Sequence, residues 1–513
     1  MTPWYFYFLG KLLLHAQGRL SLNVLLNALL LGGVLAPAPA SLGPRGARRW
    51  KHARAVAAWI LAAALAWSES WLSPPMTILQ FIIDPSLRPS FGYVLSFLAG
   101  AVDWRLLTGA AALAGAIFWS SRRGYALTPL VILGLVSVAI GDRSTRGLGG
   151  SGHGLGEFRT AEAVRGVRFP AAAGTDFDVI IIHVCSLSWE DARVAGMSDD
   201  PFWRGFHAVF MRFNSATSYS NPAALRLLRA PCGQSDHAAL FAPAGDDCYW
   251  LDALRHRGYA SWAASNHDGD YDHYAAVLQA DAHADAPLAL DGVPAPKLNF
   301  NGSRVYDDGA VLERWWRARQ RSGAKRAVLY YNTVSLHQGV HAPGQPGDWF
   351  KDRVLHYHNA ARDFFEEMQR FFALIEGSRR RAVVFFVAEH GAALEGSSIQ
   401  APDLRDIPLP SLTMVPVAVR LLGPGAPPTS RAASSRPTSY LALAELLRRF
   451  LERPPFAKDA PPLDVYLQGL PETAFVAENE SSLVLEERGR YLARDNRGRW
   501  KHLPSDAARD KTP

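Results

Sequence analysis

Cysteine is scarce in this chain, which has three cysteines among its 513 residues. That number is too low for a fold held together mainly by disulfides. Basic side chains are not gathered either: the formal net charge is +7, yet the arginines are scattered or lie beside apolar stretches, without a basic stripe or nucleic-acid motif. No convincing small-residue cleavage site follows the first apolar stretch, which argues against a removed signal peptide. Because the basic residues form no stripe, we expect no nucleic acid among the partners.

The composition divides the chain into three parts. Its length exceeds that at which one hydrophobic core usually stops growing, so at least two structural units are expected. Residues 1–141 consist of long apolar runs, whereas residues from 177 onward mix charged and apolar side chains. We predict a membrane anchor over 1–141, a flexible linker over the Gly-rich residues 142–176, and a globular domain over 177–513.

About five transmembrane helices are expected in the anchor, at residues 4–17, 20–38, 55–73, 104–121 and 125–141. Several are shorter than the ~20 residues that cross a bilayer upright. The first carries Lys11 and His15, so a buried or interfacial helix is the alternative there. Basic residues lie between the second and third stretches and between the fourth and fifth, and the positive-inside rule places both loops in the cytoplasm. The globular domain then lies outside the cytoplasm.

Three β-branched runs in the globular part have the length of strands, at Asp178–Val184, Ala327–Asn332 and Ala382–Val387. Continuous apolar runs of this kind are typical of strands buried on both faces of a parallel sheet. Residues 351–376 place their aromatic residues at helical spacing and predict a helix that covers the sheet. The sequence therefore predicts an α/β domain with a mostly parallel central sheet.

Reactive side chains follow each of these runs: Cys185, then His337, then Glu389 with His390. In open α/β sheets, sites form outside the carboxyl ends of the strands, so we expect these residues to converge. A thiolate, a carboxylate and an imidazole suit Zn²⁺ with one position left open. The alternatives are a small buried Cys185 at a strand end and a His337 that merely caps a turn.

Ser220 lies at the start of a predicted helix, with Pro222 in the first turn. Ser220 or Asn221 can cap that helix, and the exposed N–H groups and the helix dipole favour an anion there. A zinc ion beside Ser220 would lower the pKa of its hydroxyl. A plain structural cap is the alternative for Ser220 considered alone. Outside the cytoplasm we also expect Cys232 and Cys248 to form a disulfide, which leaves Cys185 unpaired.

Seven stretches, spread over nearly the whole chain, are specific in combination: Trp4–Leu9, Val184–Trp189, Phe213–Ser220, Leu225–Gln234, Tyr306–Asp308, Glu389–Gly391 and Leu404–Pro408. In them the chain resembles the BcsG family of bacterial cellulose phosphoethanolamine transferases, within the alkaline-phosphatase-like superfamily. Glu389 matches the cellulose branch, since many superfamily members have Asp there. Gln338, Val340 and Asn221 depart from the family's pattern.

The resemblance implies roles for individual residues. It implies Ser220 as the nucleophile, modified by phosphoethanolamine, and zinc held by Cys185, Glu389 and His390 together with Ser220. It also implies His337 near the attacking or leaving oxygen, Tyr219 beside the serine, and the disulfide between Cys232 and Cys248. Arg405 is a candidate for bidentate contact with the substrate phosphate, with a surface ion pair as the alternative.

The function implied is a zinc-dependent transferase in the bacterial inner membrane, with its catalytic domain in the periplasm. It would move phosphoethanolamine from phosphatidylethanolamine to a glucose 6-hydroxyl of cellulose through a phosphoserine-type intermediate, beside the cellulose synthase complex. One alternative is transfer to another envelope glycan such as lipopolysaccharide, and another is a non-catalytic scaffold of the synthase. A sulfatase is disfavoured because Ser220–Ala224 lacks the arginine of the sulfatase motif.

Overall fold

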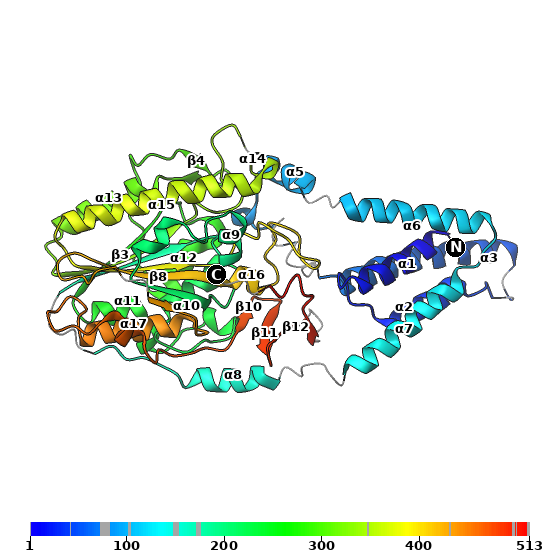
Figure 1. The fold of residues 1–513 in the computed structure, drawn as a ribbon. Coiled ribbons are helices and arrows are strands. Elements are labelled where there is room, and N and C mark those ends of the chain that lie inside the picture. Colours follow the sequence, from blue (N-terminus) through cyan, green and yellow to red (C-terminus); the bar gives the residue numbers. More distant parts are fainter. Residues whose placement is uncertain are drawn as a thin grey trace.

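The computed structural model describes residues 2–39, 41, 43–71, 79, 83–100, 104–146, 153–170, 176–345, 348–429, 432–494, 498 and 500–509. Two units are visible (Figure 1): a group of helices near the N-terminus and a larger α/β unit. The helical unit has its own hydrophobic core, separate from the core around the large sheet. Each unit therefore buries its own apolar surface, as expected for a chain of this length.

The N-terminal unit consists of α1 (Thr2–Ala16), α2 (Val24–Leu35), α3 (Pro44–Glu69), α6 (Trp104–Arg122) and α7 (Thr128–Arg146). The short helices η1 (Pro85–Leu87) and α5 (Phe91–Gly100) link it to the α/β unit. In α1, the buried Lys11 forms an ion pair with the buried Glu69 of α3, and its Nζ donates to Asn27 Oδ1 at 2.8 Å. This pairing offsets the cost of a charge in an apolar helix.

Among the described residues, no single helix is both long enough and apolar enough to cross a membrane. A bent pair of helical segments is long and apolar enough when the two are taken together: Phe91–Ala99 and Trp104–Arg122, with an angle of 57° between them.

The prediction of a basic loop before residue 55 was wrong. Helix α3 begins at Pro44, so Arg45, Arg48, Arg49, Lys51 and Arg54 are helical. Proline is favoured in the first turn of a helix, and the Ala and Arg residues that follow are good helix formers.

The predicted flexible linker at 142–176 was also wrong where the structure describes it. Helix α7 continues to Arg146, and α8 (His153–Ala163) follows. Leu155 of α8 is buried against a small antiparallel sheet, and Arg159 pairs with Glu478 at 2.9 Å. A few apolar contacts therefore order a segment whose overall composition is Gly-rich. Residues 147–152 and 171–175 of the predicted linker lie outside the described residues.

The central sheet of the α/β unit has seven strands in the order β3-β6-β1-β7-β8-β2-β9. In this order the strands are Tyr259–Ser265, Arg326–Thr333, Asp178–Val184, Ala382–Ala388, Met414–Leu422, Ala208–Asn214 and Ala432–Ser434. Strand β1 pairs in parallel with β6 and β7, and β3 pairs in parallel with β6. Strand β8 is antiparallel to β7 and β2. The three predicted strands are adjacent and parallel, which confirms the mostly parallel α/β sheet.

Helices cover both faces of this sheet (Figure 1). Helices α13 (Asp308–Arg321) and α15 (Arg353–Gly377) lie on one side, and α10 (Ser220–Leu228), α11 (Trp250–Arg255) and α17 (Tyr440–Glu452) lie on the other. The α15 side is packed with aromatic rings: Phe202 stacks on Phe365 at 4.1 Å and contacts Phe386 of β7 at 5.5 Å. Helix α15 is the predicted covering helix.

Shorter elements complete the unit: α9 (Trp189–Val194), α12 (Tyr274–Ala282), α14 (Asp348–Lys351), α16 (Pro410–Thr413) and α18 (Leu463–Leu467), with the hairpin β4 (Lys297–Leu298) and β5 (Arg304–Val305). A second, antiparallel sheet consists of β10 (Val476–Glu478), β11 (Leu483–Glu487), β12 (Arg490–Arg494) and β13 (Trp500–His502). The residue after β10, Asn479, reaches the candidate site described next.

Candidate metal and nucleophile site

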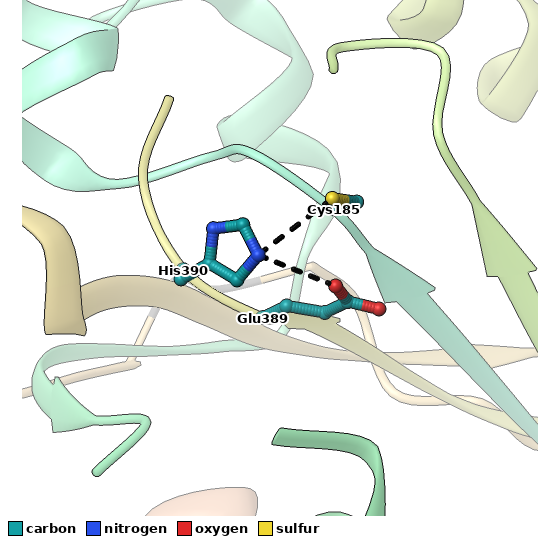
Figure 2. Close-up of side chains that lie close together, drawn as sticks. All are labelled: Cys185, Glu389 and His390. Carbon is teal, nitrogen blue, oxygen red and sulfur yellow. Dashed lines mark hydrogen bonds and ion pairs between the residues drawn. The ribbon is translucent and has the colours of Figure 1, made fainter. Parts of the chain in front are cut away.

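Three potential metal ligands meet at the carboxyl ends of β1 and β7. Cys185 follows β1 directly, and Glu389 with His390 follows β7. Because these strands are parallel neighbours, their ends lie side by side, and one ligand atom from each residue lies within 4.8 Å of the others (Figure 2). All three residues are buried. The structure thus brings together the thiol, carboxyl and imidazole that the sequence predicted would converge.

The donor atoms of these three residues suit a metal ion. Glu389 Oε1 accepts from Asn332 Nδ2 at 2.5 Å, while Oε2 is buried without a hydrogen-bond partner among the described residues. His390 Nδ1 donates to the Gly391 carbonyl at 2.9 Å, which leaves the Nε2 lone pair 3.7 Å from Cys185 Sγ and 3.7 Å from Glu389 Oε2. A sulfur, an imidazole nitrogen and an unpaired carboxylate oxygen form a donor set that zinc accepts.

The pKa shifts of these three residues also favour a bound cation. Burial, together with the nearby Glu389 carboxylate, raises the pKa of the Cys185 thiol to about 12. Burial likewise raises the pKa of Glu389. Burial lowers the pKa of His390, with Arg405 adding to the shift, so this imidazole is held in the neutral form that binds metals. A bound cation favours the thiolate and carboxylate forms and reverses the first two shifts.

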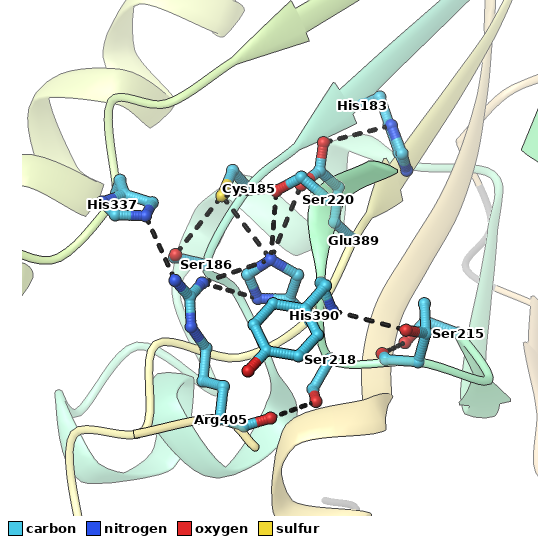
Figure 3. Close-up of polar contacts among 12 residues, drawn as sticks. His183, Cys185, Ser186, Ser215, Ser218, Ser220, His337, Glu389, His390 and Arg405 are labelled. Atoms are coloured by element: carbon cyan, nitrogen blue, oxygen red, sulfur yellow. Dashed lines mark hydrogen bonds and ion pairs between the residues drawn. The ribbon is translucent and has the colours of Figure 1, made fainter. Parts of the chain in front are cut away.

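Ser220 lies beside these three residues. Its Oγ is 3.3 Å from His390 Nε2 and 3.6 Å from Cys185 Sγ (Figure 3). The prediction that Ser220 or Asn221 caps the helix was wrong, because Tyr219 is the N-cap and α10 begins with Ser220 itself. A capping hydroxyl would turn back toward the helix N–H groups, whereas the Ser220 hydroxyl faces the potential ligands.

Arg405 joins two histidines at the same site. Figure 3 shows its guanidinium between His390 and His337, with Nη1 3.3 Å from His390 Nε2 and Nη2 3.2 Å from His337 Nε2. Among the described contacts, this guanidinium faces imidazoles and no carboxylate, which does not match the surface ion pair considered as the alternative. A cation held against neutral rings keeps its charge available for an anionic ligand.

His337 is a buried, neutral imidazole. Its Nδ1 donates to the Gln338 carbonyl at 2.8 Å, so Nε2 carries the lone pair that accepts from Arg405. Burial, with the Arg405 charge acting in the same direction, lowers the pKa of His337 to about 3. The ring stacks on Phe300 with centroids 5.0 Å apart. His337 is therefore neutral at neutral pH, and its ring is buried and does not cap a turn on the surface.

Tyr219 lines the cavity in front of Ser220, but its hydroxyl is directed elsewhere. It donates to Asp406 Oδ1 at 2.9 Å. Burial raises the pKa of Tyr219 well above its ordinary value, and the Asp406 carboxylate acts in the same direction. Tyr219 is thus a neutral donor that holds the segment carrying Arg405.

Sequence reasoning missed several residues that hold the site in place. Asn332 anchors Glu389, and its Oδ1 accepts from His267 Nε2 at 2.7 Å. His183 Nδ1 lies 3.3 Å from Glu389 Oε1. The position of Asn332, at the end of a predicted strand, was a usable signal. Asn479 had none: it lies far along the chain, yet its Nδ2 donates to Ser218 Oγ at 2.8 Å and to the Asp406 carbonyl at 3.0 Å.

A cavity of about 610 Å³ opens above Ser220 and is lined by Cys185, His337, His390 and Arg405, among others. The arrangement offers a nucleophile, a cation-binding group and a guanidinium around one cavity. Such a site can bind a phosphoryl group and attack its phosphorus.

The predicted disulfide between Cys232 and Cys248 is present, with Cα atoms 5.1 Å apart. Cys185 is free and buried. The third cysteine is therefore left as a potential metal ligand, as the sequence predicted.

Two family models match this chain. The "Cellulose biosynthesis protein BcsG N-terminal domain" matches residues 4–140, and the "Cellulose biosynthesis protein BcsG C-terminal domain" matches residues 151–500. The Cellulose biosynthesis protein BcsG of Escherichia coli K12 is 31% identical over 98% of this chain and 96% of its own length. Its counterpart in Salmonella typhimurium LT2 is 32% identical with the same coverage.

Among solved structures, the fold is similar to that of a protein in the alkaline phosphatase superfamily from Vibrio parahaemolyticus. The sequence identity is 11%, the TM-score is 0.45, and the match covers 68% of this chain and 90% of that one. The family resemblance predicted from the sequence is confirmed by the two family models and the two relatives: the chain belongs to the BcsG family of cellulose biosynthesis proteins.

Proposed function

We propose that this protein is a phosphoethanolamine transferase whose Ser220 carries the group from phosphatidylethanolamine to a glucose 6-hydroxyl of cellulose. The observation that carries the proposal is the position of the Ser220 hydroxyl, within 3.6 Å of both His390 Nε2 and Cys185 Sγ on the cavity wall. Membership of a cellulose biosynthesis family supports cellulose as the acceptor. The two-step transfer is the chemistry that a nucleophile in this setting can perform.

Zinc is the metal we propose for the site, held by Cys185, Glu389, His390 and Ser220. The unpaired Glu389 Oε2 and the lone pair on His390 Nε2, which faces Cys185 and Ser220, support this assignment. When bound, zinc lowers the pKa of the serine hydroxyl and polarises the phosphoryl oxygens.

In the first step, Ser220 Oγ attacks the phosphorus of the lipid and the bond to the diacylglycerol oxygen breaks. The serine proton ends on that oxygen. In the second step a glucose hydroxyl attacks the phosphorus, the bond to Ser220 Oγ breaks, and the acceptor proton returns to the serine. We assign the movement of these protons to the neutral His337, which lies beside Arg405 on the cavity wall, and the binding of the non-bridging oxygens to Arg405.

The N-terminal unit is the proposed anchor in the bacterial inner membrane, with the α/β unit in the periplasm. Large apolar side chains are exposed on its helices, among them Leu25, Leu29, Ile60, Leu107 and Leu133. Exposed apolar surface of this kind suits lipid or another protein. The Cys232–Cys248 disulfide supports a location outside the cytoplasm. The cellulose synthase complex is the partner we propose for this unit.

A transfer assay tests the proposal. Purified full-length protein is mixed with phosphatidylethanolamine vesicles and cellulose oligosaccharides, and the modified sugars are measured. We expect Ser220→Ala to abolish transfer and Ser235→Ala, an exposed serine outside the cavity, to retain it. Absence of transfer by the wild-type protein would instead leave a scaffold role, and transfer by Ser220→Ala at the wild-type rate would show that another residue is the nucleophile. Modification of lipopolysaccharide in place of cellulose would change the acceptor.

A further inference from the structure

The cavity above Ser220 is lined by acidic residues as well as by Arg405. Its lining includes four of them, Asp268, Asp272, Asp406 and Glu480. One of them, Asp406, already accepts from the Tyr219 hydroxyl. The guanidinium attracts a phosphate group, whereas the carboxylates of the lining would repel it. The lining therefore suits a ligand that carries a positive charge as well as a phosphate.

Asn221, directly after the nucleophile, lines this cavity and has an unpaired acceptor. The residue is only 6% exposed. Its Nδ2 donates to the Asp272 carbonyl and to Asp272 Oδ2, both at 2.8 Å. Because these bonds occupy the amide hydrogens, the orientation of the amide is set, and Oδ1 is left without a partner among the described residues. A buried acceptor without a donor is costly, so a ligand N–H is the natural partner.

The Asp272 carboxylate is held next to Asn221 by an uncommon backbone conformation. Asp272 and the residue after it, His273, both have φ of 52°, in the left-handed region. Two successive non-glycine residues in this region cost free energy and are kept only where the surroundings demand them. Asp272 is exposed on the lining of the cavity, and its carboxylate bonds to the side chain of Asn221, the residue after Ser220.

Tyr271 supplies an aromatic ring to the same part of the cavity. Its ring packs edge-on against Phe300, with centroids 5.0 Å apart. Burial raises the pKa of Tyr271 to about 12, with the Arg405 charge opposing this shift and the Asp272 charge adding to it. The phenol therefore lies within the electrostatic field of both the guanidinium and the carboxylate. Aromatic faces attract ammonium groups, most strongly where water is excluded.

We propose that Asn221 Oδ1, the Asp272 carboxylate and the Tyr271 ring form the subsite that receives the ammonium group of the transferred phosphoethanolamine. The inference rests on the proposed function, because it assumes that the phosphorus is bound at Ser220. Two carbons separate the phosphate oxygen from the nitrogen in phosphoethanolamine. Asn221 follows the nucleophile directly in the sequence and bonds to Asp272, so one residue connects Ser220 to the carboxylate of the subsite.

The test compares two chromogenic diesters with the full-length protein. One is 4-nitrophenyl phosphoethanolamine, and the other is 4-nitrophenyl ethyl phosphate, which lacks the amine. We expect the wild-type protein to prefer the amine, and Asp272→Asn to lower the ratio of the two kcat/KM values by about 10- to 100-fold, the usual effect of losing a hydrogen bond to a charged group. Asp270→Asn, the same substitution at an exposed neighbour outside the cavity, should keep the wild-type ratio.

The outcomes separate this inference from the proposed function. Failure of the wild-type protein to cleave either diester would count against the transferase itself. Cleavage with no preference for the amine, or an unchanged ratio in Asp272→Asn, would overturn the ammonium subsite alone. Tyr271→Leu provides a second variant, for which the subsite again predicts a lower ratio. An unchanged ratio in Tyr271→Leu would overturn the subsite even if Asp272→Asn failed to fold.

Discussion

Arg405 is the residue on which the proposed chemistry depends most after the nucleophile itself. Its guanidinium contacts His390 and His337, so one cation is shared between the candidate metal site and the candidate base. Its backbone carbonyl accepts a hydrogen bond at 2.5 Å from the Oγ of Ser218, which lies two residues before the nucleophile. The side chain and the backbone of Arg405 are therefore both fixed by the site, which suits a group that must hold a phosphate in one orientation.

Replacement of Arg405 by lysine tests this role. Lysine keeps the charge but loses the planar fork that binds two phosphate oxygens, so we expect kcat/KM for phosphodiester cleavage to fall about 100-fold. Arg436→Lys, at an exposed surface ion pair, should have no effect. Wild-type rates in Arg405→Lys would show that the guanidinium geometry is not used.

Glu367 gives a prediction about stability and pH. Burial, together with the nearby Asp308 and Asp307 carboxylates, raises its pKa from 4.5 to about 7. Because the folded-state pKa is raised, the stability that the protonated carboxyl contributes is fully present below pH 4.5 and is lost as the pH rises through 7. Glu367→Gln should therefore raise Tm relative to wild type at pH 8 but not at pH 4. An equal change at both pH values would contradict the raised pKa.

Among the elements, the sequence predicted those whose signal is local. Strand β1 was predicted at its observed bounds, and β6 and β7 within one residue at each end, because each is a continuous apolar run. Strand β3 (YASWAAS) is rich in Ala and Ser, and β8 contains Pro416, so neither carries the usual strand pattern. The same limit applies to the site: Cys185, Glu389 and His390 follow recognisable strands, whereas Asn479 reaches the site only through tertiary packing.

A buried ion pair joins helix α13 to strand β1. Arg319 of α13 donates from Nε and Nη2 to the two carboxylate oxygens of Asp178 at the start of β1, at 3.0 and 2.8 Å, and both residues are almost fully buried. Removal of one partner leaves the other charge unpaired in the core, so Arg319→Ala should lower the free energy of unfolding by about 3–5 kcal/mol.

Urea unfolding of the purified protein measures this loss. The double variant Asp178→Leu with Arg319→Met replaces both charges by apolar groups and should recover much of the stability. If Arg319→Ala were as stable as wild type, the pair would not hold α13 against the sheet.

At the scale of the whole molecule, the N-terminal unit and the catalytic cavity are connected. Ser90 N donates to the Phe300 carbonyl at 3.0 Å, and the Tyr93 ring lies 5.3 Å from that of Phe300, which lines the cavity. Asp84 lies 3.5 Å from His273, which also lines the cavity. The segment after the first three helices thus reaches the rim of the proposed site for the lipid donor.

The orientation proposed for the chain predicts which residues are accessible from the periplasm. Tyr125, after the basic pair Arg122 and Arg123, should face the cytoplasm, and the exposed Asp459 should face the periplasm. A membrane-impermeant maleimide should therefore label Asp459→Cys in intact spheroplasts and Tyr125→Cys only after permeabilisation. The native cysteines give little background, since one is buried and two are bonded. The reverse labelling pattern would contradict the orientation.

The most direct measurement of the central claim is tandem mass spectrometry of the full-length protein after incubation with phosphatidylethanolamine vesicles and without an acceptor. We expect a covalent phosphoethanolamine group on Ser220, which disappears when cellulose oligosaccharides are added. A phosphoethanolamine group mapped to any other residue, or transfer to the oligosaccharides by a protein in which Ser220 is never modified, would contradict the claim that this serine is the nucleophile.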